Sequence, residues 1–280
     1  MKYLVLGSSG QIGAELCEYL KKHGHEYVEF DLVRGPDEDL RTNDNPLLDA
    51  AVKECDFVFF LAFDIGGAKY LKKYQDTYDY MTNNQKIMVN TFGVLKKYNK
   101  PFLFASSQMS SMSFSTYGLL KNLGEKMTRS IGGRVVQFWN VYGLERDLEK
   151  SHVITDLILK ADQTGKIELM TNGEESRQFL HAEDCSRCLV TLSERYADIN
   201  PDQPLHVSSF EWSKVIDIAG MISSNFENIP VLPSEAHDEV QHSMKIEPSQ
   251  YIFQFWKPEI KLEDGIRDII KQMRELKMIK

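Results

Sequence analysis

The chain has 280 residues, of which 42% are hydrophobic and 26% are charged, and its formal net charge is −8. This composition is that of an ordinary soluble globular protein, and the length suits one large α/β domain with a smaller appendage. The negative charge argues against nucleic acid or an anionic membrane as the main partner, because phosphate groups select basic surfaces. No apolar run approaches the roughly 20 residues that span a bilayer, and glycine follows residues 1–6 too soon for a signal peptide. We therefore expect a cytoplasmic protein that binds neither nucleic acid nor membrane.

Short apolar runs alternate with longer amphipathic stretches over the first 143 residues. The runs are rich in Val, Phe, Tyr and Leu, which predicts strands over residues 2–6, 27–30, 57–61, 102–105 and 135–138. After the first run, Ile12, Leu16 and Leu20 recur at helical spacing, and Gly24 stands where that helix would end. Such alternation implies βαβ crossovers, so we predict an α/β fold with a doubly wound parallel sheet of the Rossmann type.

The pattern changes at about residue 151. Helical segments then predominate, prolines punctuate the chain and strands are brief. We interpret residues 1–150 as the sheet domain and residues 151–280 as a smaller α/β domain that is interwoven with it. The last predicted element is a charged amphipathic helix over residues 262–278.

The four cysteines do not form a convincing disulfide or metal framework. Cys17 and Cys55 stand alone among apolar residues, which is typical of buried thiols. Cys185 and Cys188 form a Cys-x-x-Cys pair, for which a redox or zinc role is the alternative to a structural one. No second pair accompanies them, and in a helix this spacing only puts both on one face. The histidines show no metal spacing either, so we expect no bound metal.

A glycine-rich turn connects the first predicted strand to the first predicted helix. Glycine permits a tight turn and lets backbone N–H groups approach a pyrophosphate at the positive end of the helix. A position between strand and helix is what a dinucleotide-binding motif requires. The predicted cofactor contacts from this turn are Gly7, Ser9, Gly10, Gln11, Ile12 and Gly13. We therefore predict that residues 1–150 form the dinucleotide-binding domain and that residues 151–280 form the substrate-binding domain.

The second predicted strand ends at Asp31, eighteen residues past Gly13. A carboxylate there can accept hydrogen bonds from both adenosine ribose hydroxyls and would repel a 2′-phosphate. The sequence therefore favours NAD over NADP as the cofactor. Arg34 is near enough to keep NADP open as an alternative.

Tyr117 and Lys121 are four residues apart in a helical stretch, so they lie on one face. An ammonium group beside a phenol is expected to lower the phenol pKa from its usual value of about 10. Such a phenol can exchange a proton with an alcohol or carbonyl oxygen while a hydride moves. Together with a strand that ends at Ser106 and Ser107, this pair indicates an oxidoreductase site.

These motifs together resemble the extended short-chain dehydrogenase/reductases, of the NAD-dependent epimerase/dehydratase type that acts on nucleotide sugars. The resemblance extends over nearly the whole chain. Besides the turn, Asp31 and the Tyr117/Lys121 pair, the similar segments are residues 39–40, residues 61–63, Asn84, residues 140–143, residues 177–184, residues 256–258 and residues 262–266.

The resemblance implies a role for each matching residue. Tyr117 would be the acid/base, Lys121 would bind the nicotinamide ribose, and Ser107 would hydrogen-bond the reacting sugar oxygen, with Ser106 as its rival. The further cofactor contacts it implies are Asp39, Leu40, Leu61, Ala62, Phe63 and Asn84. On the substrate side it implies Gly66 and Gly67, whose loop resembles those of members that use GDP-sugars, with Asn140 and Arg177 at the nucleotide diphosphate.

One of these residues has an alternative role, and two helical regions imply an assembly. The alternative for Arg177 is a surface ion pair with Glu174 or Glu175. Helices around residues 68–98 and 117–130 correspond to those that pair in the family, which implies a homodimer.

Three departures from the family pattern narrow the chemistry. Tyr117 comes only ten positions after Ser107, so the sugar site is expected to be more open and Ser110 or Ser111 remains an alternative hydroxyl. Gln108 and Met109 stand where dehydratases carry Asp-Glu, and neither titrates usefully, which disfavours dehydration. No cysteine is near Tyr117 to act as a second acid/base, and His152 or His181 is the available substitute.

The sequence thus predicts NAD-dependent oxidoreduction at a sugar carbon of a nucleotide sugar, with C4 favoured, in carbohydrate biosynthesis. An epimerase and a net dehydrogenase are both compatible with it. The first alternative is an NADP(H)-dependent 4-keto-nucleotide-sugar reductase. The second is a non-catalytic regulator that senses the dinucleotide, against which retention of the Tyr117/Lys121 pair argues.

Overall fold

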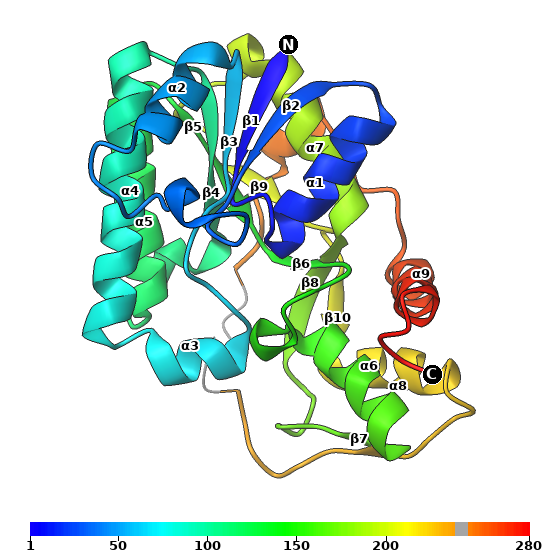
Figure 1. Cartoon of the computed structure of the whole chain (residues 1–280). Coiled ribbons are helices and arrows are strands. Elements are labelled where there is room, and N and C mark those ends of the chain that lie inside the picture. The colour runs from blue at the N-terminus through cyan, green and yellow to red at the C-terminus, as the bar shows by residue number, and fades with distance from the viewer. Residues whose placement is uncertain (239–245) are drawn as a thin grey trace.

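Six parallel strands form the central sheet of the computed structural model, which describes residues 1–238 and 246–280 (Figure 1). In spatial order they are β2 (Glu26–Phe30), β1 (Lys2–Leu6), β3 (Phe57–Phe60), β4 (Phe102–Ser107), β5 (Arg134–Phe138) and β9 (Leu205–Val207). The five strands predicted from the sequence are confirmed, each within two residues of its expected bounds. The sixth strand, β9, comes from the second half of the chain, so a distant segment completes the sheet.

Helices cover both faces of this sheet, as the doubly wound prediction requires. On one face α1 (Gln11–Lys22) packs beside α7 (Ala182–Glu194) over a core that includes Leu16, Leu20 and Leu189. The other face carries α2 (Pro46–Glu54), α4 (Tyr78–Tyr98) and α5 (Thr116–Ser130). Figure 1 shows α4 and α5 side by side along one flank of the sheet.

Strand β3 shows why the sequence signal for the sheet is strong. Phe57 and Phe59 lie in the core under α1 and α7, whereas Val58 and Phe60 lie in the core under α4 and α5. Side chains alternate between the faces of a strand, so a strand with both faces covered reads as one continuous apolar run. All four of these side chains are buried.

The strand order reverses at β1, which pairs with β2 on one side and with β3 on the other. In an open α/β sheet such a reversal leaves a crevice beyond the carboxyl ends of the strands, where ligands bind. The glycine-rich turn after β1 and the segment after β3 therefore border the expected ligand site.

A second, smaller unit follows the central sheet (Figure 1). It contains a three-stranded sheet of β6 (Asn140–Tyr142), β8 (Ser176–His181) and β10 (Trp212–Lys214), and a pair formed by β7 (Ile167–Glu168) and β11 (Val231–Leu232). The helices α6 (Val153–Thr164), α8 (Val215–Ser224) and α9 (Leu262–Glu275) contribute to its separate apolar core. Because α7 and β9 return to the central sheet between these elements, the two units are interwoven.

Some elements differ from the expected bounds. Helix α9 ends at Glu275 rather than at residue 278, because Lys277 adopts a left-handed conformation with φ of 57°. The helical region 68–98 is divided into α3 (Ala68–Tyr74) and α4, where the Thr77 hydroxyl accepts a hydrogen bond from Tyr80 N at 3.3 Å and caps α4. Five short 3-10 helices complete the described chain: η1 (Pro36–Glu38), η2 (Gln108–Ser111), η3 (Leu148–Lys150), η4 (Tyr196–Asp198) and η5 (Gln250–Gln254).

The cysteines have structural surroundings. Cys185 and Cys188 are buried and unpaired on α7, and burial raises the pKa of both thiols. Among residues 1–238 and 246–280, no three His, Cys, Asp or Glu side chains are grouped as metal ligands would be. Within the same residues, no helix combines the length and the apolar character needed to cross a membrane.

Candidate active site

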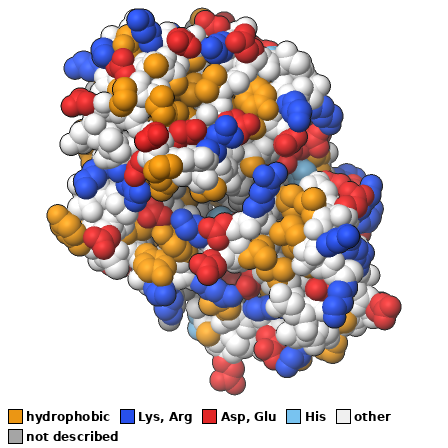
Figure 2. Space-filling model, in the orientation of Figure 1, with side chains coloured by type: hydrophobic (Ala, Val, Ile, Leu, Met, Phe, Trp, Pro, Cys, Tyr) orange, Lys and Arg blue, Asp and Glu red, His pale blue; other side chains and the backbone are white. Residues whose placement is uncertain are grey.

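A cavity of about 910 Å³ runs from the carboxyl ends of the central strands toward the smaller unit. The turn after β1, the segments after β3 and β4, helix α5 and residues of β6 and β8 all line it. Figure 2 shows acidic and basic side chains interspersed over the face drawn there, which fits the modest overall charge. Its volume is near the upper end of the range of about 300–1,000 Å³ that is usual for ligand and cofactor sites.

The glycine-rich turn forms one end of this cavity, and at two of its glycines there is no room for a Cβ atom. Gly7 has a φ of 87°, and a Cβ on it would lie 2.7 Å from the Ala62 nitrogen. A Cβ on Gly13 would lie 2.0 Å from the Gly7 carbonyl oxygen. Gly10 precedes the first residue of α1, and its Cβ would meet only the Gly7 oxygen, at 3.5 Å. The turn therefore presents the N-terminus of α1 to the cavity, as a phosphate-binding turn does.

One side chain at this helix N-terminus has an unused donor. Gln11 lines the cavity, and its Nε2 atom is buried with no hydrogen-bond partner among the described residues. A buried amide donor normally has a partner. The N-terminus of α1 and this donor together fit the pyrophosphate of a dinucleotide.

Asp31 lies at the end of β2, beside the turn. Its carboxylate accepts hydrogen bonds from Ser9 N at 2.9 Å and from Val33 N at 3.0 Å. Glu38 accepts a hydrogen bond from Asp31 N at 2.7 Å, so a second carboxylate lies close by. Arg34, which kept NADP open, forms ion pairs with Glu29 and Glu38. A 2′-phosphate at this place would meet two carboxylates and an arginine that is already paired.

The other predicted cofactor contacts divide into two groups. Five of them line the cavity: Asp39, Leu40, Leu61, Ala62 and Phe63. Asn84 does not line it, because its fully buried amide accepts from Asp64 N at 2.8 Å and donates to Asp64 O at 3.2 Å. In this structure Asn84 fixes the segment that follows β3 instead of reaching the cavity.

Ser107, Tyr117 and Lys121 meet in the cavity despite the short segment between them. That segment forms η2, and the absence of a side chain on Gly118 lets it pack on α5, since a Cβ there would lie 2.2 Å from Met109 O. The Ser107 hydroxyl forms a hydrogen bond with Tyr117 that lowers the phenol pKa. Lys121 donates from Nζ to Ala105 O at 2.7 Å and lies 3.7 Å from the centre of the Phe63 ring.

Burial changes the proton affinities of this group in a way the sequence did not predict. The pKa of Tyr117 is raised to about 12, because burial outweighs the hydrogen bond from Ser107. The pKa of Lys121 is lowered to about 7, again by burial, with an opposing effect from Glu125. The expected lowering of the Tyr117 pKa by Lys121 is therefore absent here, since the ammonium is directed to Ala105 and Phe63 and lies 5.8 Å from the Tyr117 ring centre.

The rival serine has a different environment. The Ser106 hydroxyl donates to Glu125 Oε1 at 2.6 Å on the buried side of β4. Ser106 thus uses its hydroxyl within the protein, whereas Ser107 presents its own to Tyr117. Ser110 is buried, and its hydroxyl accepts from Gln137 Nε2 at 3.1 Å.

The predicted substrate residues line the far end of the cavity. Asn140 and Arg177 come from the neighbouring strands β6 and β8. Arg177 is nearly buried and forms an ion pair with Asp238. The alternative of an ion pair with Glu174 or Glu175 is wrong, because Glu174 pairs with Lys214 and Glu175 accepts from Thr171.

Gly66 and Gly67 form part of the cavity wall by close packing. A Cβ on Gly67 would lie 2.2 Å from Ser151 O, and Gly67 N donates to Lys150 O at 3.0 Å. Gly66 has similarly little room beside the Tyr70 side chain. The two glycines thus join the segment after β3 to the chain entering α6.

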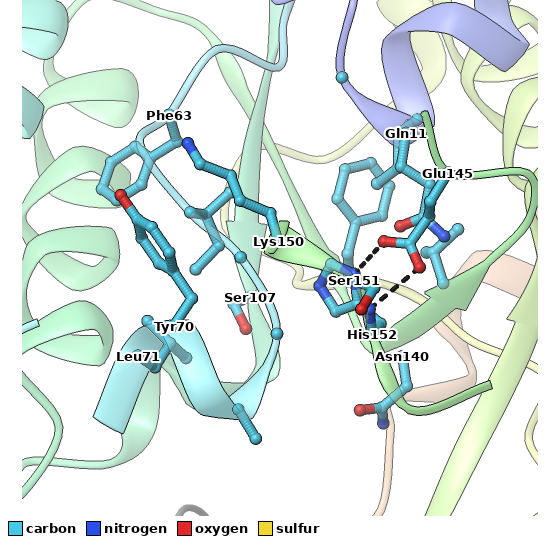
Figure 3. Close-up of a pocket in the computed structure, with 18 of the residues that line it drawn as sticks. Gln11, Phe63, Tyr70, Leu71, Ser107, Asn140, Glu145, Lys150, Ser151 and His152 are labelled. Carbon is cyan, nitrogen blue, oxygen red and sulfur yellow. Dashed lines mark hydrogen bonds and ion pairs between the residues drawn. The ribbon is translucent and has the colours of Figure 1, made fainter. Parts of the chain in front are cut away.

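Two groups of cavity side chains form contacts that the sequence did not predict. His152 Nδ1 lies 2.6 Å from Glu145 Oε1, and His152 N donates to Glu145 Oε2 at 3.0 Å. Across the cavity, Asp64 accepts from Tyr70 at 2.6 Å and from Lys150 at 3.3 Å. Figure 3 shows Tyr70 on one side and the His152 and Glu145 pair on the other, with Ser107 between them in that view. The histidine was named as a substitute acid, but nothing in the sequence pattern signals its pairing with Glu145.

Comparison with known proteins identifies the family. Residues 3–207 match the NAD dependent epimerase/dehydratase family. A GDP-mannose 3,5-epimerase of Oryza sativa subsp. indica is 25% identical over 320 residues, covering 95% of this chain and 80% of that protein.

Solved structures show the same fold. An epimerase of Methanothermobacter thermautotrophicus superposes with a TM-score of 0.87 at 19% identity, covering 99% of this chain and 93% of the other. A UDP-glucose 4-epimerase of Thermotoga maritima, solved with UDP-glucose, superposes with a TM-score of 0.82 at 16% identity, covering 99% of both chains.

Proposed function

Because this chain belongs to the NAD dependent epimerase/dehydratase family, we propose that it transfers a hydride between NAD and a sugar carbon of a nucleotide sugar, with C4 favoured. The observation that carries the proposal is the meeting of Ser107, Tyr117 and Lys121 in the same cavity that the glycine-rich turn borders. When bound, NAD would accept the hydride from the carbinol carbon. The remaining tasks fall to side chains of this chain.

Tyr117 would take the hydroxyl proton of the sugar as the carbon is oxidised, and it would return the proton when the carbonyl is reduced. Ser107 would donate a hydrogen bond to the same sugar oxygen and hold it beside the phenol. Lys121, as an ammonium, would bind the nicotinamide ribose, whereas burial raises the pKa of Tyr117 to about 12 despite the hydrogen bond from Ser107. Asn140 and Arg177 would hold the nucleotide diphosphate, for which a guanidinium is well shaped.

NAD is supported over NADP by the charges around Asp31. Asp31 and Glu38 lie where a 2′-phosphate would be placed, and Arg34 is held by Glu29 and Glu38. Dehydration is not supported, since Gln108 and Met109 offer no acid or base next to Ser107. The assembled Ser107–Tyr117–Lys121 group also argues against a regulator that only senses the dinucleotide.

One observation favours a second reaction at the same site. The Glu145 carboxylate orients the ring of His152, which lines the cavity and could exchange protons at a carbon next to a keto group. Oxidation at C4, proton exchange at a neighbouring carbon and return of the hydride to C4 would together be an epimerisation at C3 or C5. A relative named above, which is 25% identical to this chain, is a GDP-mannose 3,5-epimerase, and this likeness supports the second candidate.

The first experiment is to denature the purified protein and measure the NAD and NADP that are released. The folded protein is then incubated with UDP-, GDP- and dTDP-hexoses, and products are followed by NMR in heavy water. Bound NAD together with an epimerised sugar would support the main proposal as an epimerase, and accumulation of NADH would identify a net dehydrogenase. Consumption of NADPH by a 4-keto sugar would favour the reductase alternative.

Two further outcomes separate the candidates. Deuterium incorporation at C3 or C5 that is lost in His152→Asn would favour the second candidate. If neither dinucleotide binds to the folded protein, the proposal is wrong.

A further inference from the structure

Helix α5 carries a row of four polar side chains at a spacing of four residues: Tyr117, Lys121, Glu125 and Arg129. Residues at this spacing are neighbours on one face of a helix. The first three are buried, with Glu125 only 4% exposed, whereas the Arg129 side chain is 40% exposed. The carboxylate of Glu125 therefore lies one turn beyond Lys121 in the interior of the protein, where charge is costly.

Glu125 is the centre of a buried hydrogen-bond network. Its Oε1 atom accepts from the Ser106 hydroxyl at 2.6 Å and from Gln137 Nε2 at 2.8 Å, and its Oε2 atom accepts from Arg129 at 3.3 Å. Gln137 Nε2 also donates to the Ser110 hydroxyl at 3.1 Å. One carboxylate thus connects α5, the end of β4, strand β5 and the short segment η2.

The network lies directly behind the residues proposed for the reaction. Ser106 precedes Ser107 on β4 and pairs with Gln137 across the sheet. By engaging the Ser106 hydroxyl, Glu125 leaves the hydroxyl of Ser107 as the one directed at Tyr117.

The surroundings of Lys121 make Glu125 its main charged neighbour. Its ammonium faces Ala105 O on β4, the rings of Phe63 and Phe104, and the Tyr117 phenol on its own helix. Burial lowers the pKa of Lys121 to about 7, and Glu125 is the charged group that raises it. Glu125 also raises the pKa of His206 on β9, but burial keeps that pKa at about 4, so the ring is neutral near pH 7 and adds no competing positive charge.

We propose that Glu125 is a positioning residue for the reaction: its buried carboxylate favours the protonated form of Lys121 and, through Ser106, fixes the strand end that presents Ser107 to Tyr117. The inference rests on the proposed function for its catalytic consequence. Its electrostatic part concerns only this chain's own groups and is tested without substrate.

The test compares the wild type with Glu125→Gln, which removes the charge but keeps the size and an oxygen that can accept from Ser106. Arg129→Gln is the matched control, because it removes the positive charge that contacts the Glu125 carboxylate from the solvent side and leaves Glu125 itself in place. Ser106→Ala removes one hydrogen bond and leaves the charge of Glu125 in place. Each protein is labelled with 13C at the lysine Cε, and the Lys121 signal is assigned from its loss in Lys121→Arg and titrated by NMR.

We expect the Lys121 titration midpoint to fall by about one pH unit in Glu125→Gln, because an opposite charge nearby favours the charged form. In Arg129→Gln and Ser106→Ala the midpoint should stay close to that of the wild type. Activity of Glu125→Gln at pH 7 should fall about fivefold, which is the loss of protonated Lys121 when its midpoint falls from about 7 by about one unit, and it should recover in part at lower pH. A structural role alone would lower the melting temperature and leave both the midpoint and the pH profile unchanged.

An unchanged Lys121 midpoint in a folded Glu125→Gln protein would overturn the proposal. This result is distinct from a failure of the proposed function, which would appear as wild-type protein that binds no dinucleotide while its Lys121 still titrates. If Glu125→Gln does not fold, Glu125→Asp provides the second variant. It keeps the charge but shortens the side chain, so the proposal requires the Lys121 midpoint to be retained and the activity to fall.

Discussion

The Tyr117 phenol carries the proposed proton transfer, and its environment shows what the site must supply. Burial raises the pKa of Tyr117 to about 12, and the hydrogen bond from Ser107 opposes this rise. Removing the hydroxyl removes the proton carrier but keeps the ring, which meets Phe63 at a centroid distance of 5.8 Å. The hydroxyl is therefore separable from the packing of the residue.

We predict that Tyr117→Phe lowers kcat about 100- to 10,000-fold, the range for loss of a general acid/base. NAD affinity and melting temperature should change little, because the ring contacts remain. The measurements are steady-state turnover, NAD titration and a thermal melt. Tyr80→Phe is the matched control, since the Tyr80 hydroxyl is buried with no partner among the described residues, and it should keep wild-type turnover. Full turnover in Tyr117→Phe would remove Tyr117 from the mechanism.

His206 on β9 provides a pH-dependent contribution to stability. Trp139 Nε1 donates to His206 Nδ1 at 3.2 Å, and burial lowers the pKa of His206 to about 4. The unfolded chain takes up the proton at a pH near 6.5, whereas the folded chain resists it until about 4. The unfolded state thus binds more protons in this window, so stability falls as the pH falls from 6.5 toward 4.

We predict that His206→Asn loses less stability than the wild type between pH 7 and pH 5, by about 1–2 kcal/mol. The asparagine oxygen can still accept from Trp139. Urea unfolding at the two pH values measures the difference, with His23→Asn, an exposed histidine on the surface, as the control. Parallel losses in the wild type and His206→Asn would contradict the assignment.

At the scale of the element, the glycines of the turn between β1 and α1 are of two kinds. Some have no room for a side chain, whereas another faces the cavity and has room for one. A Cβ on Gly13 would lie 2.0 Å from Gly7 O, which no small shift relieves. A Cβ on Gly10 would lie 3.5 Å from the same oxygen, an ordinary contact. The same substitution at the two positions should therefore act in different ways.

We predict that Gly13→Ala lowers both the melting temperature and NAD affinity, because α1 must move away from the turn. Gly10→Ala should leave the melting temperature within a few degrees of the wild type while it weakens NAD binding, since its methyl group would point at the pyrophosphate. Thermal melts without ligand and NAD titrations measure the two effects. Equal losses of stability in both variants would refute this account of the turn.

The elements that could be predicted best from the sequence were those whose pattern lies within a few neighbouring residues. The run from Phe57 to Phe60 predicted a strand because both of its faces are covered, and the spacing of Tyr117 and Lys121 placed them on one helical face. Helix ends were less well predicted. The left-handed conformation of Lys277, which ends α9, could not be predicted because no glycine or proline is found at that position.

Contacts between distant segments could not be predicted in the same way. Arg177 pairs with Asp238, 61 residues later, and Asn84 turns to the Asp64 backbone instead of the cavity. The direction of the Tyr117 pKa shift also depends on burial, which arises only when Phe63 and the short η2 segment pack around the phenol. Such properties follow from tertiary packing and leave no periodic pattern in the sequence.

At the scale of the whole molecule, both units contribute residues to the wall of the cavity, and neither unit forms the cavity alone. The turn after β1 and helix α5 belong to the central sheet, whereas Asn140, Arg177 and His152 belong to the smaller unit. Two ion pairs are among the contacts that join the units across the cavity: Lys150 with Asp64, and Lys69 with Asp156 at 2.6 Å. Exposed ion pairs of this kind contribute little to the free energy of unfolding. We therefore expect these two pairs to affect how the units are oriented more than how stable the protein is.

Helices α4 and α5 form one flank of the molecule (Figure 1). Several apolar side chains on these helices are exposed, which bears on the expected homodimer. Leu119 and Leu123 on α5 are 53% and 44% exposed, and Val89 on α4 is 59% exposed. Leu119 and Leu123 are four residues apart, so they extend along one face of the helix. Apolar residues grouped on helices that face solvent are typical of a surface that pairs with another chain.

We predict that the protein is a dimer at micromolar concentration and that Leu119→Glu together with Leu123→Glu makes it monomeric. A carboxylate buried in an apolar interface without a partner is strongly unfavourable, whereas on a solvated helix it costs little. Sedimentation equilibrium measures the mass, and Leu276→Glu, at an exposed leucine after α9, is the matched control that should remain dimeric. A wild-type protein that sediments as a monomer would refute the dimer. A double variant that remains dimeric would place the interface elsewhere on the surface, because two buried charges from each chain could not be accommodated between α5 and a second copy of this flank.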